Sequence, residues 1–240
     1  MQMIMQIEIC ASSYTSLELA AQHKVSRVEL CQNLSCGGLT PSLALVRRSL
    51  DLDLNTHVLI RPRAGDFCYS ESECQQIIDE VHLYKELGIQ GLVIGALSKE
   101  RRLLTSLIRQ IREISFGIEL TFHKAFDDIS DWKSAMDILI ELKFDRILTS
   151  GQSVNVFEGI ETLKSYKSYA NGRIQILPGG GVGVDNIQSI LNGLQPDEIH
   201  FSGTKKEVKD NSEYFASDVL SVDSQKLHNL VELTKSYRAI

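Results

Sequence analysis

Apolar and polar residues follow two recurring patterns along the chain. Short runs in which every second residue is apolar are typical of β-strands, and longer segments with apolar residues every three or four positions are typical of amphipathic helices. The strand pattern occurs eight times, at residues 7–10, 25–31, 57–63, 91–96, 117–123, 145–149, 173–177 and 198–202. Helical segments separate these runs, so strands and helices alternate from end to end.

Local start signals support the predicted helices. Thr40-Pro41 suits the cap and first turn of a helix, and Ser70 with Glu73 forms a capping box. The polar stretch 204–221 is expected to be a loop, followed by a last helix within 222–238. Eight strand–helix units predict a single-domain TIM (β/α)₈ barrel over residues 1–240, since such barrels need roughly 250 residues. An open doubly wound sheet is the alternative.

Composition narrows the classes of function. The net charge of −6 argues against sequence-independent nucleic-acid binding, which depends on clustered Lys and Arg. No apolar stretch approaches the ~18 residues of a membrane span, and the short apolar start lacks the charged segment of a signal peptide. The five cysteines are an odd number without regular spacing. We therefore expect a cytosolic protein that keeps its cysteines reduced and does not bind a membrane.

The predicted inward faces of the strands are unusually polar. The pattern apolar-Glu-apolar-Cys occurs twice, at residues 7–10 and 28–31, and alternate residues of a strand share a face. Sorting by this rule places these residues inside the barrel: Glu8, Cys10, Glu29, Cys31, Leu59, Arg61, Arg63, Glu119, Thr121, His123, Glu198, His200 and Ser202. Barrel interiors are normally filled with Val, Ile and Leu. We expect Arg61 and Arg63 to pair with the glutamates, because buried charges need partners.

This polar interior predicts a site at the carboxyl ends of the strands, where barrel active sites lie. Arg61 and Arg63 would clamp an anion, and one of Glu8, Glu29, Glu119 or His123 would act as general acid or base. Candidate phosphate-binding residues follow strands six to eight: Thr149, Gly180, Gly181 and Ser202. The alternatives are a buried salt-bridge network without a catalytic role and, for the glycines, a plain tight turn.

Cys10 and Cys31 suggest a different chemistry. Neighbouring strands lie about 4.8 Å apart, so the two thiols could share one soft cation, and thiolates select Cu(I) over hard cations. The pair could instead form a disulfide or remain as inert buried thiols.

Several stretches together resemble the CutC family, named for copper homeostasis. They are residues 8–10, 27–31, 37–42, 61–67, 122–127, 146–151, 178–182 and 198–202, in order along nearly the whole chain. The resemblance implies a TIM barrel, a cytosolic location and a homo-oligomer of two or more chains. It also implies copper binding by the two cysteines that correspond to Cys10 and Cys31. Where the family usually has Arg, this chain has Lys124.

Two functional hypotheses follow. The first is a Cu(I)-binding protein of copper homeostasis, with Cys10 and Cys31 as ligands. The second is an enzyme that acts on a small anionic or phosphorylated metabolite at the site lined by Glu, Arg and His. A barrel that serves only as a scaffold explains the polar interior least well.

Overall fold

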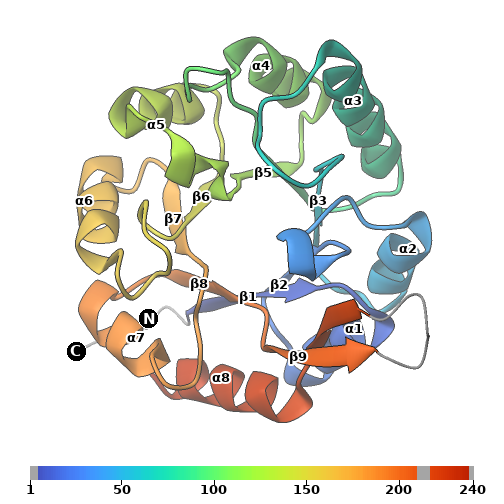
Figure 1. The fold of residues 1–240 in the computed structure, drawn as a ribbon, viewed down its shortest axis with the longest axis vertical. Helices are drawn as coiled ribbons and strands as arrows, with labels where there is room; N and C mark the ends of the chain where they lie inside the picture. The colour runs from blue at the N-terminus through green and yellow to red at the C-terminus, as the bar shows by residue number, and fades with distance from the viewer. Residues whose placement is uncertain (1–4, 210–216, 238–240) are drawn as a thin grey trace.

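The computed structural model describes residues 5–209 and 217–237. Eight parallel strands form a central ring, and helices cover its outside (Figure 1). The strands are β1 (Gln6–Ala11), β2 (Arg27–Leu30), β3 (Thr56–Leu59), β4 (Gly91–Ile94), β5 (Glu119–Phe122), β6 (Arg146–Thr149), β7 (Gln175–Pro178) and β8 (Glu198–Phe201). The α-helices are α1 (Tyr14–His23), α2 (Leu43–Asp51), α3 (Glu71–Glu86), α4 (Thr105–Ile114), α5 (Trp132–Glu141), α6 (Ile160–Ala170), α7 (Ile187–Leu194) and α8 (Ser224–Ser236).

The order of the strands in the sheet confirms the predicted TIM barrel. Each strand pairs with its neighbours in the sequence, and β1 pairs with both β2 and β8. A parallel bridge between Gly179 and His200 joins β7 to β8 and leaves the barrel nearly closed. A doubly wound sheet would instead reverse its strand order at a switch point.

The main apolar core lies between the strands and the helices. Outward residues of the strands, such as Ile9, Val28, Val58, Leu92 and Leu120, are completely buried there. A second, small cluster lies inside the ring and consists of Cys10, Cys31, Leu59 and Val93. The inward faces are otherwise largely polar, as the alternation pattern predicted.

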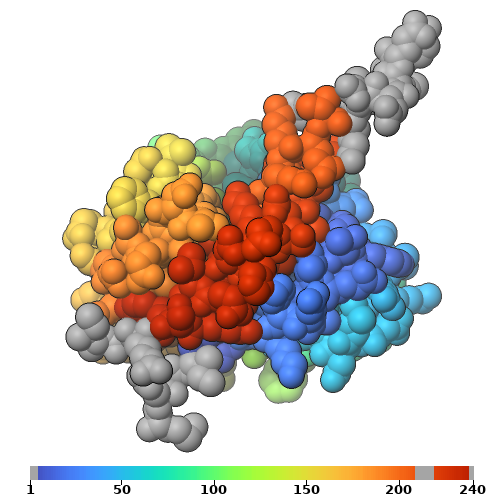
Figure 2. All heavy atoms as spheres, turned by 90° about the horizontal axis from the view of Figure 1, so that it is seen from below, coloured from blue at the N-terminus to red at the C-terminus, as the bar shows by residue number. Residues whose placement is uncertain are grey.

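The stretch expected to be a loop contains a β-hairpin instead. β9 (Thr204–Lys209) pairs with β10 (Ser217–Val222) in antiparallel register, with Thr204 opposite Val222. The hairpin projects from the body of the molecule in Figure 2. Several residues of the hairpin are only half-buried, and its sequence lacks a regular apolar alternation, which is why the sequence pattern missed it. Parts of the expected loop and last helix, 210–216 and 238, lie outside the described residues.

Candidate functional site

An ion-pair network crosses the barrel interior near the amino-terminal ends of the strands. Arg27 on β2 pairs with Glu8 on β1, and its Nη2 lies 2.7 Å from a carboxylate oxygen of Glu198 on β8. Arg146 on β6 continues the network, at 3.2 Å from Glu198 and 2.8 Å from Glu119. Burial alone would raise the pKa of Glu8, but Arg27 and His200 hold it well below its usual range. Glu8 is therefore a carboxylate inside the barrel.

The expectation that Arg61 and Arg63 pair with the glutamates of the barrel was wrong. Both lie beyond the end of β3. Arg61 still lines the interior cavity, as predicted, but among the described residues it pairs with no carboxylate. The Arg61 guanidinium donates to the backbone oxygens of Cys36, Gly38 and Gly65, each at 2.9 Å.

Arg63 turns away from the interior. It is about one-third exposed and pairs with Glu73 at 2.6 Å and with Asp66 at 3.1 Å. Arg27 and Arg146, which lie on the strands themselves, instead pair with Glu8, Glu119 and Glu198.

Three interior histidines pack against glycines of neighbouring strands. A Cβ added at Gly91 would lie 2.4 Å from the His57 ring, and one at Gly95 would lie 2.4 Å from the His123 ring. At Gly179 an added Cβ would meet His200 at 3.0 Å. The glycines therefore leave the room that the imidazoles occupy inside the ring.

His57 offers a test of this packing through the pH dependence of stability. Burial, together with the charges of Arg27 and Arg146, lowers the pKa of His57 to about 3, although the charge of Glu8 acts in the opposite direction. Glu119, 3.5 Å from His57, does not offset these effects, because it is about half exposed and already paired with Arg146. Between pH 6.5 and 3 the unfolded chain binds a proton at His57 that the folded chain does not. Stability contributed by His57 is therefore lost as pH falls through this window, by about 1.4 kcal/mol per pH unit.

We expect His57→Gln to flatten the pH dependence of the unfolding free energy by about this slope. Urea unfolding at pH 7, 6 and 5 measures it. His82→Gln is the matched control, because His82 is exposed on α3. Parallel pH profiles for wild type and His57→Gln would contradict the assignment.

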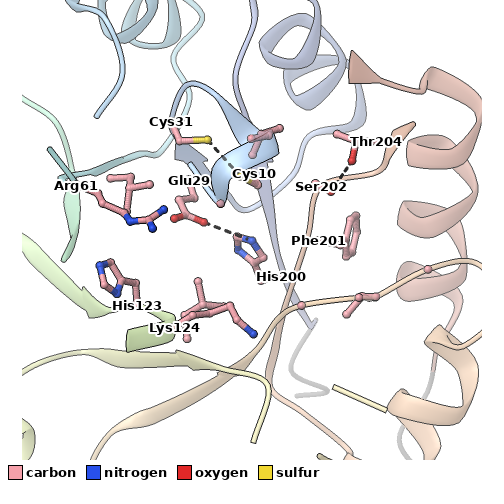
Figure 3. Close-up of a pocket in the computed structure, with 18 of the residues that line it drawn as sticks. Cys10, Glu29, Cys31, Arg61, His123, Lys124, His200, Phe201, Ser202 and Thr204 are labelled. Carbon is pink, nitrogen blue, oxygen red and sulfur yellow. Dashed lines mark hydrogen bonds and ion pairs between the residues drawn. The ribbon is translucent and has the colours of Figure 1, made fainter. Parts of the chain in front are cut away.

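A cavity of about 430 Å³ opens at the carboxyl ends of the strands (Figure 3). Its polar and sulfur-bearing lining residues are Cys10, Glu29, Cys31, Arg61, His123, Lys124, His200, Ser202, Thr204 and Lys226, and its glycines include Gly180 and Gly181. This is the end of the barrel where the sequence predicted the site. Glu8, Arg63, Glu119 and Thr149 do not line it.

The two cysteine thiols meet at one wall of the cavity. Their Sγ atoms are 3.5 Å apart, and both residues are free and buried. Cys10 pairs in register with Glu29, so Cys31 lies two residues further along its strand. The hydrogen bond with Cys31, together with burial, raises the pKa of the Cys10 thiol well above its usual value. The Cys10 thiol is therefore protonated in the absence of a metal.

His200 and Glu29 lie beside the Cys10 thiol. His200 Nδ1 is 2.7 Å from Glu8, and its Nε2 is 3.3 Å from Glu29. Burial alone would lower the pKa of His200, but Glu29, Cys10 and Glu8 raise it well above its usual value. Burial, together with the neighbouring Glu8, raises the pKa of Glu29 to about 7. One ligand atom each from Cys10, Glu29 and His200 lie within 4.8 Å of one another, a spacing that a single metal ion could bridge.

The loops after β5, β6 and β7 build the other side of the cavity. Lys124 Nζ lies 2.6 Å from Ser150 Oγ and 3.2 Å from Asp127, and a Cβ at Gly180 would lie 2.8 Å from this nitrogen. Thr149 donates to Asp127 and is turned away from the cavity. Of the four predicted phosphate-binding residues, Gly180, Gly181 and Ser202 line the cavity.

Several residues of the interior and the cavity were not identified from the sequence, namely Arg27, His57, Gly91, Gly95 and Lys226. Arg27 has the same parity as Glu29, and the inward position of His57 follows from the same rule. Gly91 begins β4 and Gly95 directly follows it, so the two glycines, four residues apart, share the inward side. Lys226 on α8 had no sequence signal, since only the folded chain brings it to the cavity mouth.

Comparisons with known proteins fit this architecture. The model of the CutC family matches residues 5–205. The chain belongs to the CutC family. It is 38% identical over 238 residues to a CutC family protein of Glaesserella parasuis, covering 95% of this chain and 98% of the relative. A CutC family protein of Parabacteroides distasonis is 36% identical, with 96% and 98% covered.

Solved structures give the same result. A CutC protein from Streptococcus agalactiae, named for copper homeostasis, is 36% identical with a TM-score of 0.77, covering 82% of this chain and 98% of that chain. N-(5'-phosphoribosyl)anthranilate isomerase from Pyrococcus furiosus has a TM-score of 0.56 at 14% identity, covering 97% and 100%, and shares the fold alone. Within the described residues, no helix of this CutC chain is long and apolar enough to cross a membrane.

Proposed function

We propose that this CutC chain binds one Cu(I) ion as cargo in copper homeostasis, through Cys10 and Cys31. The proposal rests on the short distance between the two Sγ atoms, which lie 3.5 Å apart at the wall of the cavity. Thiolate sulfur is the soft ligand that Cu(I) prefers, and Leu59 and Val93 pack against the pair. A role of this kind fits a reducing, cytosolic setting, where thiols persist. We also expect a homo-oligomer, as the family resemblance implies.

His200 is the third ligand in this proposal. Glu8 holds its Nδ1, which orients the ring and leaves Nε2 directed toward Glu29 and Cys10. A carboxylate behind a ligating imidazole is a common arrangement at metal sites, because it fixes the ring and raises its basicity. The imidazole and both thiols must lose protons to bind the ion. Glu29, a harder oxygen ligand, is better suited to accept such a proton.

Titration of reduced, metal-free protein with Cu(I) in competition with a chromogenic Cu(I) chelator tests the proposal. We expect the protein to withhold one equivalent of Cu(I) per chain from the chelator. Excess Mg²⁺ should not change this stoichiometry, because Mg²⁺ selects oxygen ligands. If the chelator takes all the copper at equal concentrations, the proposal fails.

A second candidate function is an enzyme acting on a small anionic or phosphorylated metabolite. The volume of the cavity favours it, since about 430 Å³ falls within the range of small-molecule sites and far exceeds one ion. Glu29, with a pKa of about 7, suits general acid–base work near neutral pH. Glu8, in contrast, is tied into its ion pairs with Arg27 and His200.

A further inference from the structure

The side chains that line the cavity carry an excess of positive charge. Among the described residues that line the cavity, Glu29 is the single carboxylate, whereas Arg61, Lys124 and Lys226 are cationic. The whole chain has a net charge of −6, so this concentration of cations runs against the overall balance. A cleft lined by one sign of charge raises the local concentration of ligands of the opposite sign.

Arg61 is the most unusual of these cations. Its side chain is buried, and three backbone oxygens hold the guanidinium in one orientation. Within the described residues no carboxylate pairs with it, and its Nε has no hydrogen-bond partner. A buried charge without a counter-charge is costly, and an anion bound in the cavity would supply one.

His123 adds a neutral donor next to Arg61. Its Nδ1 accepts a hydrogen bond from the backbone N–H of Ala125 at 3.1 Å. Burial and the charge of Arg61 lower the pKa of His123 to about 3, so the ring is neutral and its single proton is on Nε2. This Nε2 is buried and has no partner among the described residues. A buried N–H group without an acceptor is unfavourable, and a ligand oxygen would satisfy it.

The Phe67 ring contacts both His123 and Arg61. The His123 ring lies 4.8 Å from the Phe67 ring, and the Arg61 guanidinium carbon lies 5.2 Å from the same ring. In Figure 3 Arg61 and His123 lie on one side of the cavity, with Lys124 below and the thiols above. The anion-facing groups and the thiol pair therefore belong to different parts of one cavity.

We propose that this cavity binds a small organic oxyanion, with its carboxylate or phosphate group held by Arg61 and His123 and its charge balanced further by Lys124 and Lys226. The proposal deepens the second candidate function by naming the ligand class and its donors. It does not depend on Cu(I) binding, because Cys10 and Cys31 are not among the donors.

Isothermal titration calorimetry of the reduced, metal-free protein tests this, with inorganic phosphate and malonate as probes and sodium chloride at matched ionic strength as the reference. We expect at least one probe to bind. Binding of phosphate alone indicates a phosphorylated ligand, and binding of malonate alone indicates a carboxylate. Arg61→Gln should weaken binding about tenfold or more, as expected for a hydrogen bond between charged groups.

Arg61 also ties three loop carbonyls together, so a second variant guards against a folding defect. Lys226→Met on α8 should weaken binding severalfold while its circular dichroism spectrum stays that of wild type. Arg63→Gln is the matched control, since Arg63 does not line the cavity, and it should bind as wild type does. The Cys10→Ser, Cys31→Ser double variant should also bind the anion, whether or not its affinity for Cu(I) changes. No binding of either probe to wild type, or equal binding by wild type, Arg61→Gln and Lys226→Met, would overturn the proposal.

Discussion

Replacing Arg27 with Met is expected to lower the free energy of unfolding by about 3–5 kcal/mol, the usual cost of removing one partner of a buried ion pair. Arg27 is 4% exposed and contacts both Glu8 and Glu198. The methionine would leave Glu198 with Arg146 and Glu8 with His200 alone. Glu8 is fully buried and charged, so most of the penalty comes from this carboxylate.

Chemical denaturation at pH 7 measures the effect. Arg48→Met is the matched control, because its ion pair with Glu18 is exposed, and it should cost less than about 1 kcal/mol. Combining Arg27→Met with Glu8→Gln should recover part of the loss, since the glutamine carries no charge. An Arg27→Met protein within about 1 kcal/mol of wild type would show that the network contributes little to stability.

The Cys10→Ser, Cys31→Ser double variant is expected to lose Cu(I) affinity by a factor of about 10³ or more. Removal of an outer partner of a metal ligand already costs 10–100-fold, and here both soft ligands are replaced by hard hydroxyls. The two serines are close to the thiols in size, so the small interior cluster with Leu59 and Val93 should survive. Competition with a Cu(I) chelator measures the change.

Cys68→Ser, Cys74→Ser is the control for this variant. These two cysteines are half-buried near α3 and bind backbone oxygens, Cys68 that of Ser98 and Cys74 that of Tyr69. The control should keep the affinity of wild type. If both double variants bind Cu(I) equally well, the copper is held elsewhere on the chain.

The sequence predicted the barrel because alternation is strong wherever one strand face packs against helices. The same parity rule brought Glu8, Cys10, Glu29, Cys31 and His200 to the interior. It also indicated the carboxyl ends of the strands as the place of the cavity. These are properties of single strands, which local sequence specifies.

The ion-pair and hydrogen-bond partners of the interior residues could not be predicted in the same way. Arg27 and Arg146 reach Glu8 and Glu198 because of the register between strands, which depends on the closed ring. Arg61 lines the cavity as the alternation predicted, but backbone oxygens rather than glutamates bind its guanidinium. Contacts between distant segments, such as Lys226 at the cavity mouth, have no local signal at all.

X-ray absorption at the copper K-edge of the Cu(I)-loaded protein tests the central claim most directly. The thiol pair, with His200 beside it, predicts a Cu(I) edge and a first coordination shell of two sulfur atoms and one nitrogen. The sulfur contribution should disappear in the Cys10→Ser, Cys31→Ser variant loaded with the same amount of copper. A shell of nitrogen and oxygen alone in wild type, or an unchanged sulfur shell in the variant, would contradict copper binding by Cys10 and Cys31.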